Sequence, residues 1–231
     1  MEAIINWIQV HPMLVFLSLS YFAMCYWCCK FKKRLEFHWV ELFLLPLVHL
    51  ILGYLSAQFM ALVEVGFVVK KAATLRLFGA VFLMPVMYYV WAKLTKRDSA
   101  LTLDFASVCV ILGLMGGRLN CFLTGCCAGR LMGNIRMPLR EIEMVFYVLF
   151  IAFYAIRIVK RKTHGQVYPL YMILYGILRF AMEFFREEYT TNVGVLHLAH
   201  IWAIVSVVAG SIWLLKVNKI IFNRKKPEKT R

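Results

Sequence analysis

Long apolar runs separated by short basic clusters constrain this chain more than any other feature. A helix needs about 20 apolar residues to cross a hydrocarbon core of roughly 30 Å. The composition agrees, since 62% of the residues are hydrophobic and 17% are charged. We therefore expect an all-α, polytopic membrane protein that forms one domain over residues 1–231. Its seven transmembrane helices should lie at about 10–29, 38–62, 74–92, 101–117, 141–158, 167–185 and 198–216.

The basic clusters predict the orientation of these helices. Of the 27 Lys and Arg residues, 18 lie in four clusters that follow expected spans one, three, five and seven: KFKKR (30–34), KLTKR (93–97), RIVKRK (157–162) and the tail from Lys216. Positively charged loops stay in the cytoplasm. We thus expect an outer N-terminus and a basic cytoplasmic tail at about 217–231. Because the charge lies between apolar runs, the net +15 does not indicate nucleic acid.

One stretch lacks the composition of a membrane span: residues 116–130, GGRLNCFLTGCCAGR. Glycine allows close backbone approach to a ligand, and the planar guanidinium of arginine suits phosphate. Arg118 ends the expected fourth span, where a buried charge is costly unless an anion balances it. The alternative is an ordinary loop whose arginine lies among lipid headgroups.

The expected sixth span carries the second informative pattern. Arg179, Glu183 and Arg186 stand at i, i+4 and i+7 and so share one helical face, with Tyr175 one turn earlier. A simple ladder of salt bridges is one interpretation, but arginine outnumbers glutamate on this face. Together with Arg118 and two further arginines, Arg130 and Arg136, these side chains are expected to converge on one anionic group near the outer leaflet.

Other polar residues receive structural interpretations. His49 is expected to be hydrogen-bonded within its span. Asp104, Glu141 and Glu143 are expected near helix N-termini, where the macrodipole favours carboxylates. Gly79 lies in a span where small residues let helices approach.

The two motifs together resemble the prolipoprotein diacylglyceryl transferases of the bacterial inner membrane. GRLNCFLTGCCAGR (117–130) is similar to the family signature G-R-x-G-N-F-x-N-G-E-x-x-G-R, and YGILRFAMEFFRE (175–187) is similar to the penultimate span of the family. The chain departs from the signature at Cys121, Thr124 and Cys126. It also has Phe78-Gly79-Ala80 where the family carries His-Gly-Gly.

The resemblance implies transfer of a diacylglyceryl group from phosphatidylglycerol to the cysteine thiol of a lipoprotein precursor. It implies a multi-pass protein of the bacterial plasma membrane, with its active site at the outer leaflet and without a cofactor or metal ion. The catalytic residues would be Arg118, Arg179 and Glu183, with Glu183 either orienting Arg179 or accepting a proton. The substrate-binding residues would be Arg118, Gly129, Arg130, Tyr175, Arg179 and Arg186.

Three cysteines in the first motif leave alternatives open. Adjacent Cys126 and Cys127 would pair only in a strained ring, so a bridge from Cys121 to one of them is more plausible. A thiolate near Arg118 could instead act as a nucleophile that carries lipid covalently.

Two other functions also fit the departures from the family signature. One is a related transferase with a different acceptor. The other is a non-catalytic membrane protein that binds or transports phospholipid.

Overall fold

The computed structural model describes residues 12–64, 66–67, 76–126, 128–160, 162–186, 192–193 and 196–225. Within these residues the chain forms seven α-helices and two hairpins of two-residue strands. The helices are α2 (Pro12–Phe31), α3 (Trp39–Glu64), α4 (Phe78–Leu94), α5 (Ser99–Thr124), α6 (Leu139–Val159), α7 (Val167–Glu183) and α8 (Leu198–Lys225). The antiparallel hairpins pair β1 (Leu131–Met132) with β2 (Ile135–Arg136) and β3 (Asn192–Val193) with β4 (Leu196–His197).

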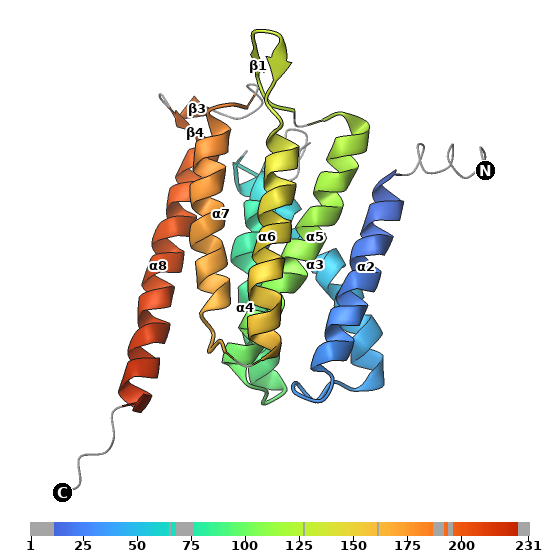
Figure 1. Cartoon of the computed structure of the whole chain (residues 1–231), viewed down its shortest axis with the longest axis vertical. Coiled ribbons are helices and arrows are strands. Elements are labelled where there is room, and N and C mark those ends of the chain that lie inside the picture. Colours follow the sequence, from blue (N-terminus) through green and yellow to red (C-terminus); the bar gives the residue numbers. More distant parts are fainter. Residues whose placement is uncertain are drawn as a thin grey trace, which may run out of the picture.

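The helices form an up-and-down bundle of the kind expected for a membrane protein (Figure 1). Five of the described helices are long and apolar enough to cross a membrane: α2, α3, α5, α6 and α8. Helix α4 is apolar but shorter. The basic ends of α2, α4, α6 and α8 all lie at the lower end of the view in Figure 1. The four basic clusters thus share one end of the bundle, as the charge pattern predicted.

α5 is the central helix. Two-thirds of its most apolar window (67%) is buried, compared with 33% or less in the other long apolar helices. At its lower end the buried ring of Phe105 contacts the rings of Trp27, Phe37 and Tyr88 at centroid distances of 6.3, 5.6 and 6.2 Å. The surrounding helices bury one side within the bundle and expose large apolar side chains on the other, as lipid-facing helices do.

Small residues bring α3 and α4 together, as predicted. A Cβ built on Gly79 of α4 would lie 2.6 Å from the carbonyl carbon of Ser56 and 2.9 Å from the Cα of Ala57, both backbone atoms of α3. Only a residue without a Cβ permits this approach, which membrane helices use to gain van der Waals contact.

The structure corrects two helix boundaries. α5 continues to Thr124, seven residues past the expected end at 117, so the first half of the glycine-rich motif is helical and not a loop. α8 continues to Lys225, so residues 217–225 of the expected tail are helical. Both helices are longer than predicted because the fall in hydropathy marks the end of the apolar segment, and a helix can continue beyond that segment.

The interpretation of Asp104 as a helix-start residue was wrong. Asp98 is the N-cap of α5 and accepts the backbone N–H groups of Ala100 and Leu101. Asp104 lies inside α5, fully buried, and accepts the N–H groups of Gly165 and Val167, each at 2.8 Å. It therefore anchors the start of α7 against α5.

The close approach at Gly79 predicts that a single methyl group will destabilise the bundle. We expect Gly79→Ala to lower the midpoint of thermal unfolding in detergent, since overpacking costs about 1–3 kcal/mol. Gly53→Ala in α3 is the matched control because a Cβ there meets nothing within 4 Å. Equal unfolding midpoints for the two variants would contradict the packing described here.

Candidate functional site

The two sequence motifs meet through backbone hydrogen bonds at the upper end of the bundle. The N–H of Arg130 donates to the carbonyl of Phe185 at 2.6 Å, and Gly129 forms a β-bridge with Arg186. A Cβ on Gly129 would lie 2.6 Å from both the Cβ and the carbonyl oxygen of Met137. Glycine at this position therefore lets the loop after α5 lie against the segment that leads into α6.

The C-terminus of α5 is fixed by a left-handed cap and by a cation. Gly125 has φ 71° and ends the helix, in the αL conformation that glycine adopts without strain. Arg140, in the first turn of α6, donates from Nη1 to the carbonyls of Cys121 at 3.1 Å and Cys126 at 3.4 Å. A positive charge at a helix C-terminus is favoured by the macrodipole, so Arg140 ties α5 to α6.

The centre of the site is a buried carboxylate between two arginines. Glu143 of α6 contacts Nε of Arg118 through Oε2, and its Oε1 lies 3.5 Å from Nη1 of Arg179. The exposed fractions of these three side chains are 1%, 6% and 9%. Charges so deep in a membrane bundle are tolerated only when paired, so Glu143 holds the two guanidinium groups together.

The network continues along α7 towards α8. Oε2 of Glu183 lies 3.1 Å from Nη2 of Arg179 and 3.7 Å from Nη1 of Arg186, while Oε1 lies 3.6 Å from Nδ1 of His197. Glu183 is fully buried. Its carboxylate therefore orients Arg179 from the side opposite to Glu143.

A pair of tyrosines packs next to the ion pairs. Tyr147 lies one turn after Glu143 on α6, and Tyr175 lies one turn before Arg179 on α7. Both are fully buried, and their rings stack with centroids 6.3 Å apart. The aromatic pair fixes the spacing of α6 and α7 beneath the charged groups.

The structure brings some of the predicted site residues together and leaves others apart. Five of them belong to the network or border it: Arg118, Tyr175, Arg179, Glu183 and Arg186. The backbone of Gly129 and Arg130 supports the network, whereas the side chain of Arg130 and that of Arg136 on the hairpin are exposed.

Of the three motif cysteines, Cys126 is an exposed free thiol, so it forms no bridge to Cys121. Cys121 is partly buried in the last turns of α5. The prediction for Cys127 falls outside the described residues.

Two members of the network were missed from the sequence. Glu143 does lie near the N-terminus of α6, as predicted, but its main role is the ion pair with Arg118 and Arg179. The excess of arginine over glutamate on α7 was the signal that could have identified it, because a buried arginine needs a carboxylate from some other helix. His197 gave no periodic signal.

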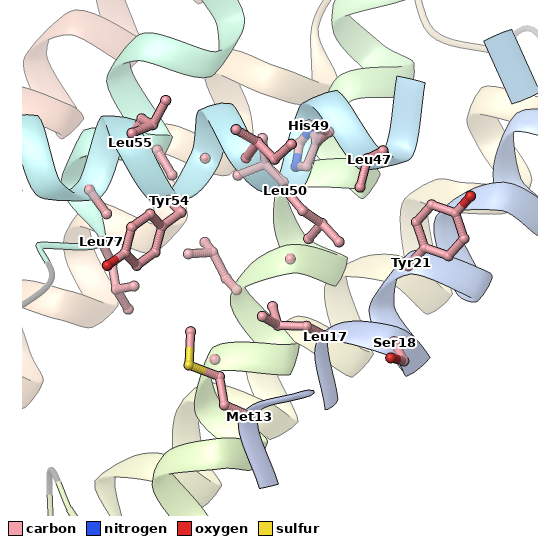
Figure 2. Close-up of a pocket in the computed structure, with 18 of the residues that line it drawn as sticks. Met13, Leu17, Ser18, Tyr21, Leu47, His49, Leu50, Tyr54, Leu55 and Leu77 are labelled. Carbon is pink, nitrogen blue, oxygen red and sulfur yellow. The ribbon is translucent and has the colours of Figure 1, made fainter. Parts of the chain in front are cut away.

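A large apolar cavity is lined by residues of α2, α3 and α5 (Figure 2). It has a volume of about 690 Å³ and lies between α2, α3 and α5. Exposed residues such as Leu14, Phe22 and Tyr54 line it, so it opens to the side of the bundle. Gly117, the neighbour of Arg118, also lines it, whereas Arg118 and Arg179 do not.

His49 borders the cavity and is hydrogen-bonded as predicted. Its Nδ1 and the buried hydroxyl of Tyr88 lie 2.9 Å apart. Among the described residues, no group of three or more His, Cys, Asp or Glu side chains is placed to hold a metal ion.

A multi-pass helical membrane protein with a buried arginine–glutamate network and an apolar cavity is the class that this fold and site define. The model of the family described as prolipoprotein diacylglyceryl transferase matches residues 47–216. The chain therefore belongs to the prolipoprotein diacylglyceryl transferase family, and is a transferase enzyme by that membership.

Individual relatives are distant. A protein of Clostridium tetani (strain Massachusetts / E88) named phosphatidylglycerol–prolipoprotein diacylglyceryl transferase is 23% identical over 205 residues, which cover 78% of this chain and 82% of that protein. Proteins with the same name from Dehalococcoides mccartyi (strain ATCC BAA-2100 / JCM 16839 / KCTC 5957 / BAV1) and Polaromonas naphthalenivorans (strain CJ2) are 24% and 29% identical. Those matches cover 63% and 56% of this chain, and 62% and 54% of the two proteins.

The position of Glu143 predicts a large loss of stability when its charge is removed. We expect Glu143→Gln to destabilise the protein by about 3–5 kcal/mol, the cost of breaking a buried pair, because two buried guanidinium groups would then face each other. The measurement is unfolding in detergent.

Glu141→Gln is the matched control for this variant. Glu141 lies two residues earlier, in the first turn of α6, but 39% of its side chain is exposed and its ion pair with Arg140 spans 3.6 Å. Exposed pairs contribute about 0–1 kcal/mol. Equal stability of Glu143→Gln and Glu141→Gln would contradict a structural role for the buried pair.

Proposed function

We propose that the protein transfers a diacylglyceryl group from phosphatidylglycerol to the cysteine thiol of a lipoprotein precursor. The observation that carries the proposal is the meeting of Arg118 and Arg179, one from each family motif, at the carboxylate of Glu143. Membership of the family and the names of the relatives support this class of reaction.

Arg118 and Arg179 are proposed to bind the phosphodiester of the lipid. A guanidinium has five N–H donors, and the contacts to Glu143 engage Nε of Arg118 and Nη1 of Arg179. Other N–H groups of both side chains can then bind phosphate oxygens. When the C–O bond of the glyceryl group breaks, the leaving glycerol phosphate gains negative charge, which these fixed cations stabilise.

The buried carboxylates fit positioning roles in this scheme. Glu143 and Glu183 are almost fully inaccessible, at 1% and 0% of their side-chain surface. A thiol cannot reach such a group, so Glu183 is proposed to orient Arg179 and not to accept the proton itself. Tyr175, Gly129, Arg130 and Arg186 are proposed to shape the headgroup site around the two catalytic arginines.

The cavity between α2, α3 and α5 is proposed to take the acyl chains. It is apolar, open to the side of the bundle and of a size typical of ligand pockets, about 300–1,000 Å³. Gly117, which precedes Arg118 in α5, lines it, and a Cβ at this position would meet nothing within 4 Å. A lipid in the bilayer could insert its chains there and present its phosphate one residue further along α5.

The proposed setting is a bacterial plasma membrane crossed seven times by a single domain. The basic ends of four helices share one end of the bundle, and the positive-inside rule makes that end cytoplasmic. The arginine network lies towards the opposite end and would face the outer leaflet, where secreted precursors are available.

Replacement of Arg118 tests the proposed transfer directly. We expect Arg118→Gln to lower the rate by at least about 10²-fold, a loss typical for removal of one fixed charge-stabilising donor. The fold should survive because Glu143 keeps Arg179 as a partner. The assay measures release of glycerol phosphate and the mass of a lipoprotein N-terminus in a strain that lacks its own transferase.

Arg157→Gln is the control, because Arg157 is exposed in the last turn of α6 at the opposite end of the bundle. Full activity of purified Arg118→Gln would end the assignment. Lipid consumption without lipoprotein modification would favour a transferase with a different acceptor. Lipid binding without release of glycerol phosphate by the unaltered protein would favour a binding or transport protein.

A graded substitution of Gly117 tests the proposed acyl-chain cavity. We expect Gly117→Leu to fill part of the cavity and to raise the KM for phosphatidylglycerol by about tenfold, equivalent to ~1.4 kcal/mol. Gly117→Ala should change it little. The same KM for both variants, with unchanged unfolding midpoints, would place the acyl chains elsewhere.

A further inference from the structure

A histidine that the proposed transfer leaves unused lies at the α8 end of the ion network. His197 ends β4, directly before α8. Its Nδ1 lies 3.6 Å from Oε1 of Glu183. Its backbone N–H donates to Nδ1 of His200 at 3.1 Å, which fixes the main chain at this position.

His197 differs from the other described members of the network in being both accessible and able to accept a proton. Its side chain is 19% exposed, whereas Glu183 is inaccessible. Arginine side chains stay charged and cannot act as bases. His200 is nearly sealed, at 2% exposure, with the rings of Phe180 and Phe184 at centroid distances of 5.0 and 4.5 Å.

We propose that His197 is a catalytic base that removes the proton from the thiol of the acceptor cysteine, with Glu183 holding its ring. This inference rests on the proposed transfer reaction. It also supplies a histidine to a chain that has Phe78-Gly79-Ala80 where the family sequence carries its own.

Proton transfer to His197 accompanies formation of the thioether bond. The S–H proton passes to Nε2 of neutral His197, and the sulfur lone pair forms a bond to the glyceryl carbon. The bond between that carbon and the phosphate oxygen breaks, and its electron pair leaves with glycerol phosphate at Arg118 and Arg179. The proton on His197 then passes to water or to the phosphate.

Glu183 gives this histidine the arrangement of a carboxylate–imidazole pair. A carboxylate next to Nδ1 favours the N–H tautomer at that atom, leaves Nε2 to accept a proton and stabilises the imidazolium that forms. Within the described residues, the charged and titratable groups around His197 include Glu183 from α7, His200 from α8 and, through the Glu183 carboxylate, Arg179, Arg186 and Glu64 of α3. One carboxylate thus orients a base and an anion-binding cation together.

The substitution His197→Asn separates the proton-accepting role from the packing role. The amide nitrogen of asparagine can take the place of Nδ1 beside Glu183, but the side chain cannot accept a proton. We expect a fall in kcat of about 10²–10⁴-fold, the contribution typical of a general base. The KM for phosphatidylglycerol should be unchanged, and the acidic limb of the pH–rate profile should disappear. Imidazole added to His197→Ala should restore part of the rate.

The control is His38→Gln, since His38 is exposed at the opposite end of the bundle. Suppose that the unaltered protein transfers lipid, Arg118→Gln does not, and His197→Asn keeps the original rate and pH profile. The assignment of His197 then fails while the transfer reaction stands. A raised KM without rescue by imidazole would also overturn it, by showing a packing role. If the unaltered protein makes no thioether, both proposals fall.

Discussion

The site depends on one interaction, the buried carboxylate of Glu143 between the guanidinium groups of Arg118 and Arg179. Two like charges held close together in a medium of low dielectric constant repel strongly, and neither helix could present its arginine to the other without an intervening anion. Three helices each supply one charge, so the pairing also fixes how α5, α6 and α7 are rotated about their axes. The residues that form the buried ion pairs therefore also specify the packing of the bundle.

Glycine serves opposite purposes in the two parts of this arrangement. At Gly79 and Gly129 neighbouring backbone atoms occupy the space that a Cβ would need, so these positions bring segments into contact. At Gly117 that space is open and borders the cavity. A sequence motif rich in glycine therefore combines two physical tasks, close packing of the loop against the segment before α6 and open space at the residue next to Arg118.

The sequence allowed the helices and the sidedness of the basic clusters to be predicted because both follow from local properties, the length of apolar runs and the position of lysine and arginine. Glu143 and Asp104 were misjudged because their partners lie far along the chain. Arg179 is 36 residues from Glu143, and Gly165 is 61 residues from Asp104. For both carboxylates a position near a helix start offered a sufficient local explanation. The end of α5 was misplaced because glycine in a sequence favours a loop, whereas packing here stabilises a helix as far as Thr124.

At two positions where this chain departs from the family signature, the backbone takes part in the packing of α5 against α6. Arg140 donates to the main-chain carbonyls of Cys121 and Cys126, an interaction that any residue at either position could accept. The two arginines that meet in the interior, by contrast, come from positions of the two motifs that match the family, and Glu143, which joins them, lies between the motifs in α6. Cys126, one of the two cysteines that replace Asn and Glu of the signature, is exposed, whereas Cys121 is partly buried in the last turns of α5. The contacts of Glu143 with Arg118 and Arg179 are present although both side chains differ from the signature. A divergent sequence thus retains a buried charged network while side chains at the end of α5 change.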